Sequence, residues 1–127
     1  MRSPVAITRA FRTAKRAQHI LAVLVRFGFA ELCQQPLAAG DYLALAARFH
    51  TFVIADIPFL TAKQPNQARR FVMLIDVLYE KGARLIVSAA GPPAALYEKG
   101  DGRFEFDRTA SRLIEMQSAQ WVERERP

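Results

Sequence analysis

The hydrophobic pattern in the middle of the chain predicts two short strands joined by a helix. Residues 51–56 and 84–89 are short apolar runs without alternation, which is typical of strands buried on both faces. Between them, residues 66–81 carry apolar side chains at helical spacing, namely Phe71, Leu74, Ile75, Leu78 and Tyr79. Pro65 stands where this helix should begin, and Gly82 stands where a C-terminal glycine belongs. This order predicts a βαβ unit with a right-handed crossover, hence an α/β fold with a small parallel sheet of at least two strands.

The pattern predicts further helices on both sides of this unit. A short helix opens at Asp41, as its N-cap, and runs to about Phe49. A longer helix begins at Asp107, also as N-cap, and ends near Trp121. Its expected inner side consists of Ala110, Leu113, Ile114 and Gln117. Residues 29–37 are expected to be irregular.

Residues 1–28 are expected to form a basic amphipathic helix. The segment contains no acid and six cations, which are Arg2, Arg9, Arg12, Lys15, Arg16 and Arg26. Three interpretations remain open for this helix. It covers the domain as an ordinary surface helix, it binds an anionic membrane surface or partner, or it is a transit-type peptide.

The charge distribution changes how the basic composition is interpreted. The net charge of +6 comes entirely from residues 1–28, because the rest of the chain balances its acids and bases. The composition therefore gives no reason to expect that the globular part binds nucleic acid. At 127 residues the chain is expected to form one domain, and its single cysteine, Cys33, is expected to be a packed thiol.

The chemistry in the sequence falls short of a complete catalytic site. The run from Val53 to Asp56 is similar to the strand that holds magnesium in P-loop ATPases, which makes Asp56 a candidate catalytic residue. However, none of the six glycines begins the GxxxxGK[ST] loop that surrounds nucleotide phosphates. The chain also has no Ser-His-Asp set in a supporting context and no zinc-type cluster, so no metal site is expected.

Three segments of the chain resemble a known family. They are PLAAGDYLALAARFHT (36–51), ARRFVMLIDVLYEKGARLIVSAAGPPAALY (68–97) and FEFDRTASRLIEMQSAQW (104–121). Together they resemble the C-terminal third of the ZapE-type ATPases, also called AFG-one-like ATPases, which are P-loop proteins of the AAA+ class. The resemblance covers about residues 29–121. It divides the chain into a helix outside the family (1–28) and a C-terminal α/β portion (29–127) with a partial P-loop ATPase-like fold.

The resemblance implies ATP hydrolysis, with ATP and magnesium, in the intact family protein. It also implies association with the bacterial divisome or with protein quality control at the mitochondrial inner membrane. The expected location is thus cytoplasmic, including the inner-membrane periphery, or mitochondrial in a eukaryote. The family's Walker A and Walker B segments lie upstream of the matching region. We therefore expect a truncated member or fragment that is inactive alone and works with a P-loop-bearing chain or a divisome protein. The alternative is a non-catalytic interaction or membrane-peripheral module.

Two arginines of the third segment are candidates for a catalytic role. Arg108 and Arg112 share one helix face in the RT-x-SRL motif. In ATPases of this class, an arginine near the γ-phosphate acts as a finger or sensor that stabilises the transferring charge. The alternative is an ion-paired helix face, with Arg112 and Glu115 three residues apart and worth about 0.2–0.5 kcal/mol.

Overall fold

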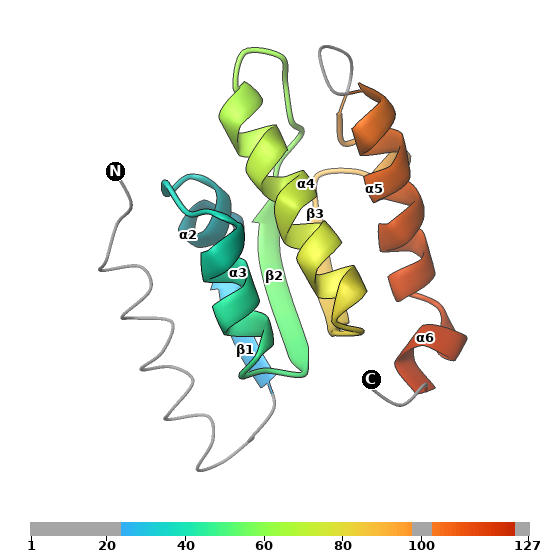
Figure 1. Cartoon of the computed structure of the whole chain (residues 1–127). Coiled ribbons are helices and arrows are strands. Elements are labelled where there is room, and N and C mark those ends of the chain that lie inside the picture. The colour runs from blue at the N-terminus through green and yellow to red at the C-terminus, as the bar shows by residue number, and fades with distance from the viewer. Residues whose placement is uncertain (1–23, 98–102, 124–127) are drawn as a thin grey trace.

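The computed structural model describes residues 24–97 and 103–123, which form a parallel sheet with helices packed against it (Figure 1). The sheet has three strands in the order β1-β2-β3, where β1 is Leu24–Gly28, β2 is Thr51–Ile57 and β3 is Arg84–Ala89. The helices are α2 (Phe29–Cys33), α3 (Ala39–Ala46), α4 (Pro65–Glu80), α5 (Arg103–Met116) and α6 (Ala119–Glu123), with a 3-10 turn η1 (Pro93–Ala95). The predicted α/β class with a small parallel sheet is confirmed.

Strand β1 corrects the prediction of a helix over residues 1–28. Residues 24–28 pair in parallel with β2, from Leu24 opposite Thr51 to Gly28 opposite Ala55. Their apolar side chains fit a helix face and a strand equally well over so short a run. Pairing with a neighbouring strand decides between the two, because Val25 and Phe27 become buried on one side of the sheet. The rest of the predicted helix, residues 1–23, lies outside the described residues.

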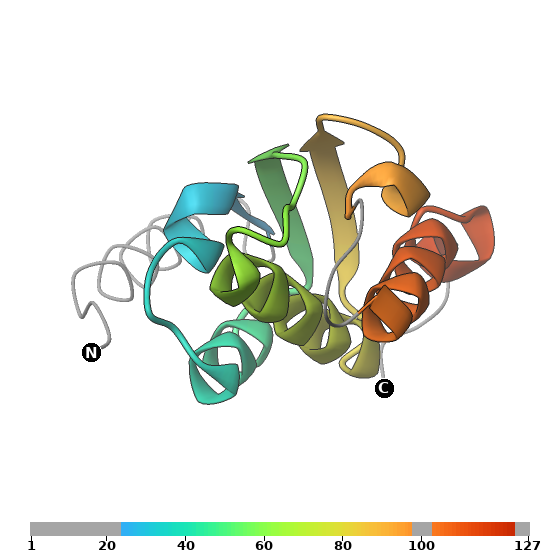
Figure 2. The same ribbon diagram turned by 90° about the horizontal axis from the view of Figure 1, so that it is seen from above.

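The strands alternate between a buried and an open side, so the prediction of burial on both faces is wrong. One side of the sheet is apolar and buried across all three strands, in Val25, Phe27, Phe52, Ile54 and Leu85. Viewed along the sheet, α3 and α4 lie on this side, and no described helix lies on the other (Figure 2). The strands look doubly buried in sequence because Val53 and Ile86, on the open side, are also apolar.

Helix α4 matches the predicted crossover helix within one residue at each end. The expected inner residues Phe71, Leu74, Ile75 and Leu78 are buried. Gly82 has a φ of 67°, in the left-handed region that a residue after a helix end often adopts. The amide of Gly82 donates to the Tyr79 carbonyl at 3.1 Å, and the amide of Ala83 donates to the Leu78 carbonyl at 2.9 Å. These two bonds form a Schellman motif, which ends the helix before β3.

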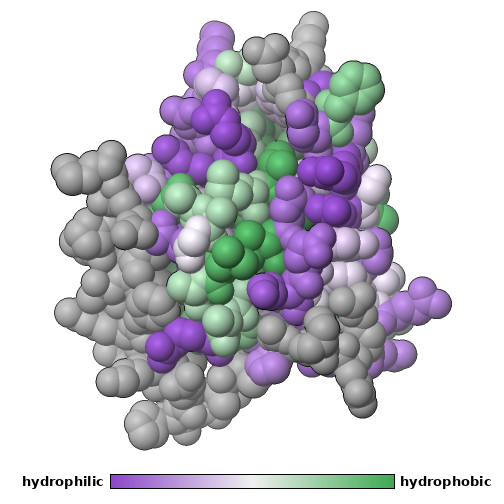
Figure 3. Space-filling model, in the orientation of Figure 1, coloured by the Kyte–Doolittle hydropathy of each residue, from purple (hydrophilic) through white to green (hydrophobic). Residues whose placement is uncertain are grey.

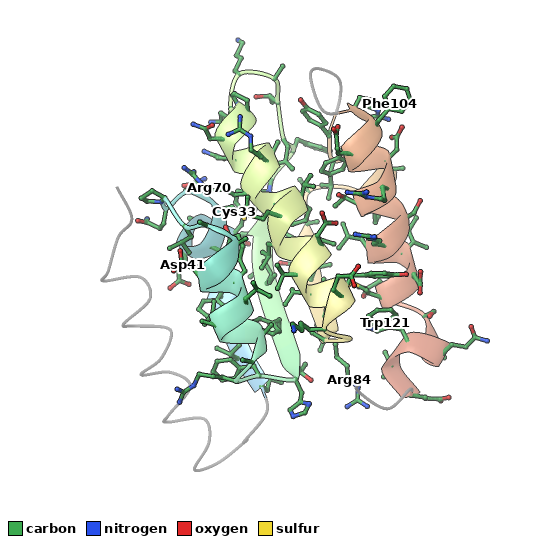
Figure 4. All side chains as sticks on the ribbon, viewed as in Figure 1. Cys33, Asp41, Arg70, Arg84, Phe104 and Trp121 are labelled. Carbon is green, nitrogen blue, oxygen red and sulfur yellow. The ribbon has the colours of Figure 1, made fainter. Side chains whose placement is uncertain are left out.

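The segment before β2 is more helical than predicted. Residues 29–33 form α2 instead of irregular chain. Asp41 is not the N-cap of α3 but lies in its first turn, where its carboxylate accepts a bond from the Ala38 amide at 2.9 Å. The Tyr42 hydroxyl donates to the Leu32 carbonyl at 2.7 Å, and Arg70 of α4 donates to the Cys33 carbonyl at 3.2 Å. The labelled side chains of Cys33, Asp41 and Arg70 show this region in Figure 4.

Helix α5 begins earlier and ends sooner than predicted. Asp107 lies inside the helix, where it pairs with Arg103 at 3.3 Å, so it is not the N-cap. Helix α5 ends at Met116. The Ser118 hydroxyl then accepts a hydrogen bond from the Trp121 amide at 3.2 Å, which caps the start of α6. On the inner side, Ala110 and Leu113 are buried as expected. Ile114 is 57% exposed and is therefore wrongly assigned; Gln117 is exposed too.

The segment that links α5 to α6, and α6 itself, bond to β3 and to the residue before it. Gln117 donates to the Leu85 carbonyl at 3.3 Å, and the Trp121 indole donates to the Ala83 carbonyl at 2.8 Å. Arg84 in turn donates to the Val122 carbonyl at 2.8 Å. Figure 4 shows Arg84 and Trp121 at the same end of the molecule. These bonds attach the C-terminal helices to the side of the sheet next to β3.

Candidate functional site

Asp56 lies at the carboxyl end of β2 in an uncommon backbone conformation. Its φ is 62°, which favours glycine, asparagine and aspartate, and the register with β3 shifts between Ile54 and Ile57. The Asp56 amide donates to the Ser88 hydroxyl at 2.9 Å, and the residue is exposed. An exposed carboxylate thus lies at the carboxyl end of the strands, where α/β folds usually bind ligands.

The two candidate arginines lie on the outer part of the contact between α4 and α5. The Arg112 guanidinium bonds to one oxygen of Asp76 at 2.5 Å, and Arg108 bonds to the other at 3.5 Å. Asp76 belongs to α4, so the expected partner Glu115 is not the residue that holds Arg112. Arg112 is therefore ion-paired, as the alternative interpretation expected, but its partner is Asp76 and not Glu115.

Aromatic side chains fix Arg112 from a second side. Its guanidinium lies 4.5 Å from the centre of the Tyr79 ring, and the Tyr79 hydroxyl donates to Glu115 at 2.9 Å. Tyr79 also stacks on Trp121, with ring centres 4.9 Å apart. The Arg112 side chain is only 21% exposed, whereas that of Arg108 is 56% exposed. Arg108 is therefore the better placed of the two to reach a phosphate or carboxylate on another molecule.

The structure does not join the three candidate residues into one site. Asp56 bonds to β3 at the carboxyl end of the sheet, while both arginines bond to Asp76 on α4. The described part of the chain holds no group of three or more His, Cys, Asp or Glu side chains that could bind a metal ion. None of its helices combines the length and the hydropathy that spanning a bilayer requires.

A cleft that the sequence did not predict lies where α4 and α5 begin. Its volume is about 370 Å³, within the range of small-molecule sites, which runs from roughly 300 to 1,000 Å³. It is lined by Pro65, Ala68, Arg69, Val72, Tyr97, Glu105 and Phe106. Its walls are mainly apolar, and they carry one cation and one acid. The lining residues come from segments far apart in sequence and form no motif, so no sequence signal could have found the cleft.

Cys33 is not a nucleophile in this fold. The residue is fully buried, and burial raises the pKa of its thiol to about 12. The neighbouring Tyr42 is also buried, and its pKa is raised by the same loss of solvation. Because only the thiolate attacks, a thiol with so high a pKa is inert near neutral pH. Cys33 is thus a packed thiol, as expected.

Apolar surface gathers over α3 and α4 on the helical side of the molecule, between more polar regions (Figure 3). The apolar residues of these helices that remain exposed or half-buried include Leu43, Val72, Met73 and Val77. Both this apolar surface and the cleft lie on the side of the sheet that the helices cover. Neither contains Asp56 or the arginine pair.

Comparison with known proteins places the chain in a family. The sequence model of the AFG1-like ATPases matches residues 4–125. The chain is 41% identical over 97 residues to the cell division protein ZapE of Escherichia coli K12, covering 76% of this chain and 26% of that protein. It is 34% identical over 131 residues to lactation elevated protein 1 homolog B of Danio rerio, covering 77% of this chain and 26% of that protein. No solved structure matches.

An uncharacterised protein of Schizosaccharomyces pombe is also similar, at 31% identity over 124 residues, or 76% of this chain and 27% of that protein. The chain thus spans about a quarter of the length of the curated relatives it matches. The family match begins at residue 4 and so includes most of residues 1–28. On this evidence the chain belongs to the AFG1-like ATPase family.

Proposed function

We propose that the chain provides the C-terminal α/β part of a cell-division-associated ATPase and works with a P-loop supplied from outside residues 1–127. The observation that carries the proposal is the family match over residues 4–125 in a sequence without a GxxxxGK[ST] loop. In this class the loop supplies most of the phosphate contacts. ATP hydrolysis therefore belongs to the assembled protein.

Within this proposal Arg108 approaches the nucleotide, and Arg112 holds the helix that carries Arg108 in position. Arg108 has an exposed guanidinium beside Asp76 and could approach a transferring phosphoryl group on the P-loop part. Arg112 is covered by Tyr79 and bonded to the same carboxylate, so its role is to hold α4 and α5 together. Magnesium usually takes one or two carboxylates together with phosphates and waters, and in this class the phosphates are held by the P-loop. Magnesium therefore enters with the nucleotide on the P-loop part.

A chimera of the E. coli relative tests the proposal. The segment of E. coli ZapE that matches this chain is exchanged for residues 24–123, and ATP hydrolysis is measured against unaltered ZapE. We expect the chimera to hydrolyse ATP, and we expect Arg108→Ala in the chimera to lower kcat. A soluble, folded chimera without activity would contradict the proposal. The isolated chain is titrated with a fluorescent ATP analogue and magnesium, and saturable binding in the low micromolar range would also contradict it.

A second candidate function is a non-catalytic module that binds a divisome protein or a membrane surface. The observation that favours it is the open side of the sheet, where the Ile86 side chain is 56% exposed. The two functions predict different results in the chimera, because ATP hydrolysis would not depend on Arg108 if the chain were only a binding module. Unchanged kcat in Arg108→Ala, with retained binding to divisome proteins, would favour this second function.

A further inference from the structure

One side of the sheet has no cover within residues 24–97 and 103–123. The strand register places Arg26, Val53 and Ile86 in one row across the three strands, and their side chains point away from the helices. A second row, formed by Leu24, Thr51 and Arg84, lies beside it. Ile86, on the outer strand β3, is 56% exposed. We call these six residues the open sheet face.

An all-parallel sheet with one uncovered face is unusual, because its connections normally place helices on both faces. Here the strands follow in one direction, β1-β2-β3, and right-handed crossovers then put every connecting helix on the same face. Helices reach the other face only when the strand order reverses, as in a doubly wound sheet. Such a reversal requires further strands beyond β1, which pairs only with β2 among the described residues.

The residues of the open sheet face are suited to contact with another protein surface rather than with solvent. Val53, on the central strand, lies beside Ile86, and the two outer strands carry the cations Arg26 and Arg84. Its two rows contain no acid. Arg84 also donates to the Val122 carbonyl, so its guanidinium is held near the edge of the face. Apolar residues beside arginines are typical of interfaces, and they complement a partner with apolar and acidic side chains.

We propose that the β1 edge and the open sheet face dock the P-loop-bearing α/β part of an AFG1-like ATPase. That part continues the sheet beyond β1 in the reverse direction and places its helices, with apolar and acidic side chains, on the open sheet face. The inference rests on the proposed function. It is supported by length, because about three quarters of ZapE lies outside the match with this chain.

Two isoleucines of equal exposure provide the test. Ile86→Asp introduces a charge on the open sheet face, and Ile114→Asp introduces the same charge on α5, where Ile114 is 57% exposed. In the ZapE chimera, Ile86→Asp is expected to lower kcat/KM by about tenfold or more, because a charge buried without a partner at an interface is costly. Ile114→Asp is expected to stay close to the unsubstituted chimera. In the isolated chain both variants are expected to unfold at the same denaturant concentration, which shows that the difference arises from docking.

Amide hydrogen exchange gives a readout that does not depend on activity. Continuation of the sheet should slow exchange along Leu24–Gly28 by about tenfold or more in the chimera relative to the isolated chain. An active chimera in which Ile86→Asp behaves like Ile114→Asp would overturn the docking surface and leave the proposed function intact. An inactive chimera counts against the proposed function, while protection of β1 would still support the docking surface and its absence would overturn it. A dimer of the isolated chain that Ile86→Asp dissociates would identify a second copy as the occupant and would also overturn the inference.

Discussion

Arg112 of α5 and Asp76 of α4, 36 positions apart in sequence, bond at 2.5 Å across the seam between the two helices. The same carboxylate receives Arg108 on its other oxygen, and the Tyr79 ring covers the Arg112 guanidinium. The pair therefore fixes the position of α5, and with it the direction in which Arg108 points.

The first prediction separates the roles of the two arginines. Arg112→Ala should destabilise the isolated chain by about 1–3 kcal/mol, because it leaves the half-buried Asp76 without its closest partner. Arg108→Ala should cost less than about 1 kcal/mol, because that side chain is mostly in solvent. Urea unfolding monitored by circular dichroism measures both. Equal losses of stability in the two variants would show that Arg112 has no special structural role.

The second prediction concerns the inner face of α4. Leu74→Ala should destabilise by about 2–5 kcal/mol, because Leu74 is buried in the core beneath the sheet. Ile114→Ala, at a residue that is 57% exposed, serves as the control and should change stability by no more than about 0.5 kcal/mol. Denaturant unfolding of both variants checks the assignment. It would be wrong if Leu74→Ala were as mild as the control.

The third prediction is a loss of stability in alkali that depends on Cys33. Burial raises the pKa of its thiol from 9.0 to about 12, so the folded state holds the proton more tightly than the unfolded chain. Stability from this group is fully present below pH 9 and is lost as the pH rises toward 12. The slope reaches about 1.4 kcal/mol per pH unit. Unfolding in urea at pH 8 and pH 10 should therefore show a smaller decline in Cys33→Ala than in the unsubstituted chain. Identical declines would refute the assignment.

The fourth prediction concerns residues 1–23. A truncated chain must begin at Leu24, because removal of residues 24–28 would delete β1. If the basic segment binds membranes, the full chain should sediment with vesicles that contain anionic lipid. Each cation near such a surface contributes about 1 kcal/mol, and binding should weaken with salt. The truncated chain should remain folded and stop binding. Loss of folding on truncation would assign residues 1–23 to the domain core instead.

The parts of the fold that could be predicted are those specified by local signals. Helix α4 carries an apolar stripe, a proline at its first turn and a glycine after its end, and each signal acts within a few residues. Strand β1 was not predicted, because five residues are too few to distinguish the hydrophobic period of a helix from that of a strand. Its state depends on pairing with β2, which begins 27 residues after the start of β1. The outward position of Ile86 likewise depends on which faces of the sheet receive helices.

The candidate site was harder to predict for the same reason. Arg108 and Arg112 were identified correctly as neighbours on one helix face, but their partner Asp76 lies on another helix. Glu115 is the acid nearest to Arg112 in sequence, yet its carboxylate accepts a hydrogen bond from the Tyr79 hydroxyl instead. The cleft between α4 and α5 brings together residues from both helices and Tyr97, which no spacing rule connects.

The contacts of β3 with α5 and α6 have a consequence for self-association. An exposed edge strand offers unpaired amides and carbonyls that can template aggregation. Next to β3, Gln117 and Trp121 already occupy the carbonyls of Leu85 and Ala83. This strand is thereby shielded from pairing with a second copy of the chain. Removing the shield, as in Trp121→Ala with Gln117→Ala, should convert a well-behaved chain into one that forms β-rich aggregates when concentrated.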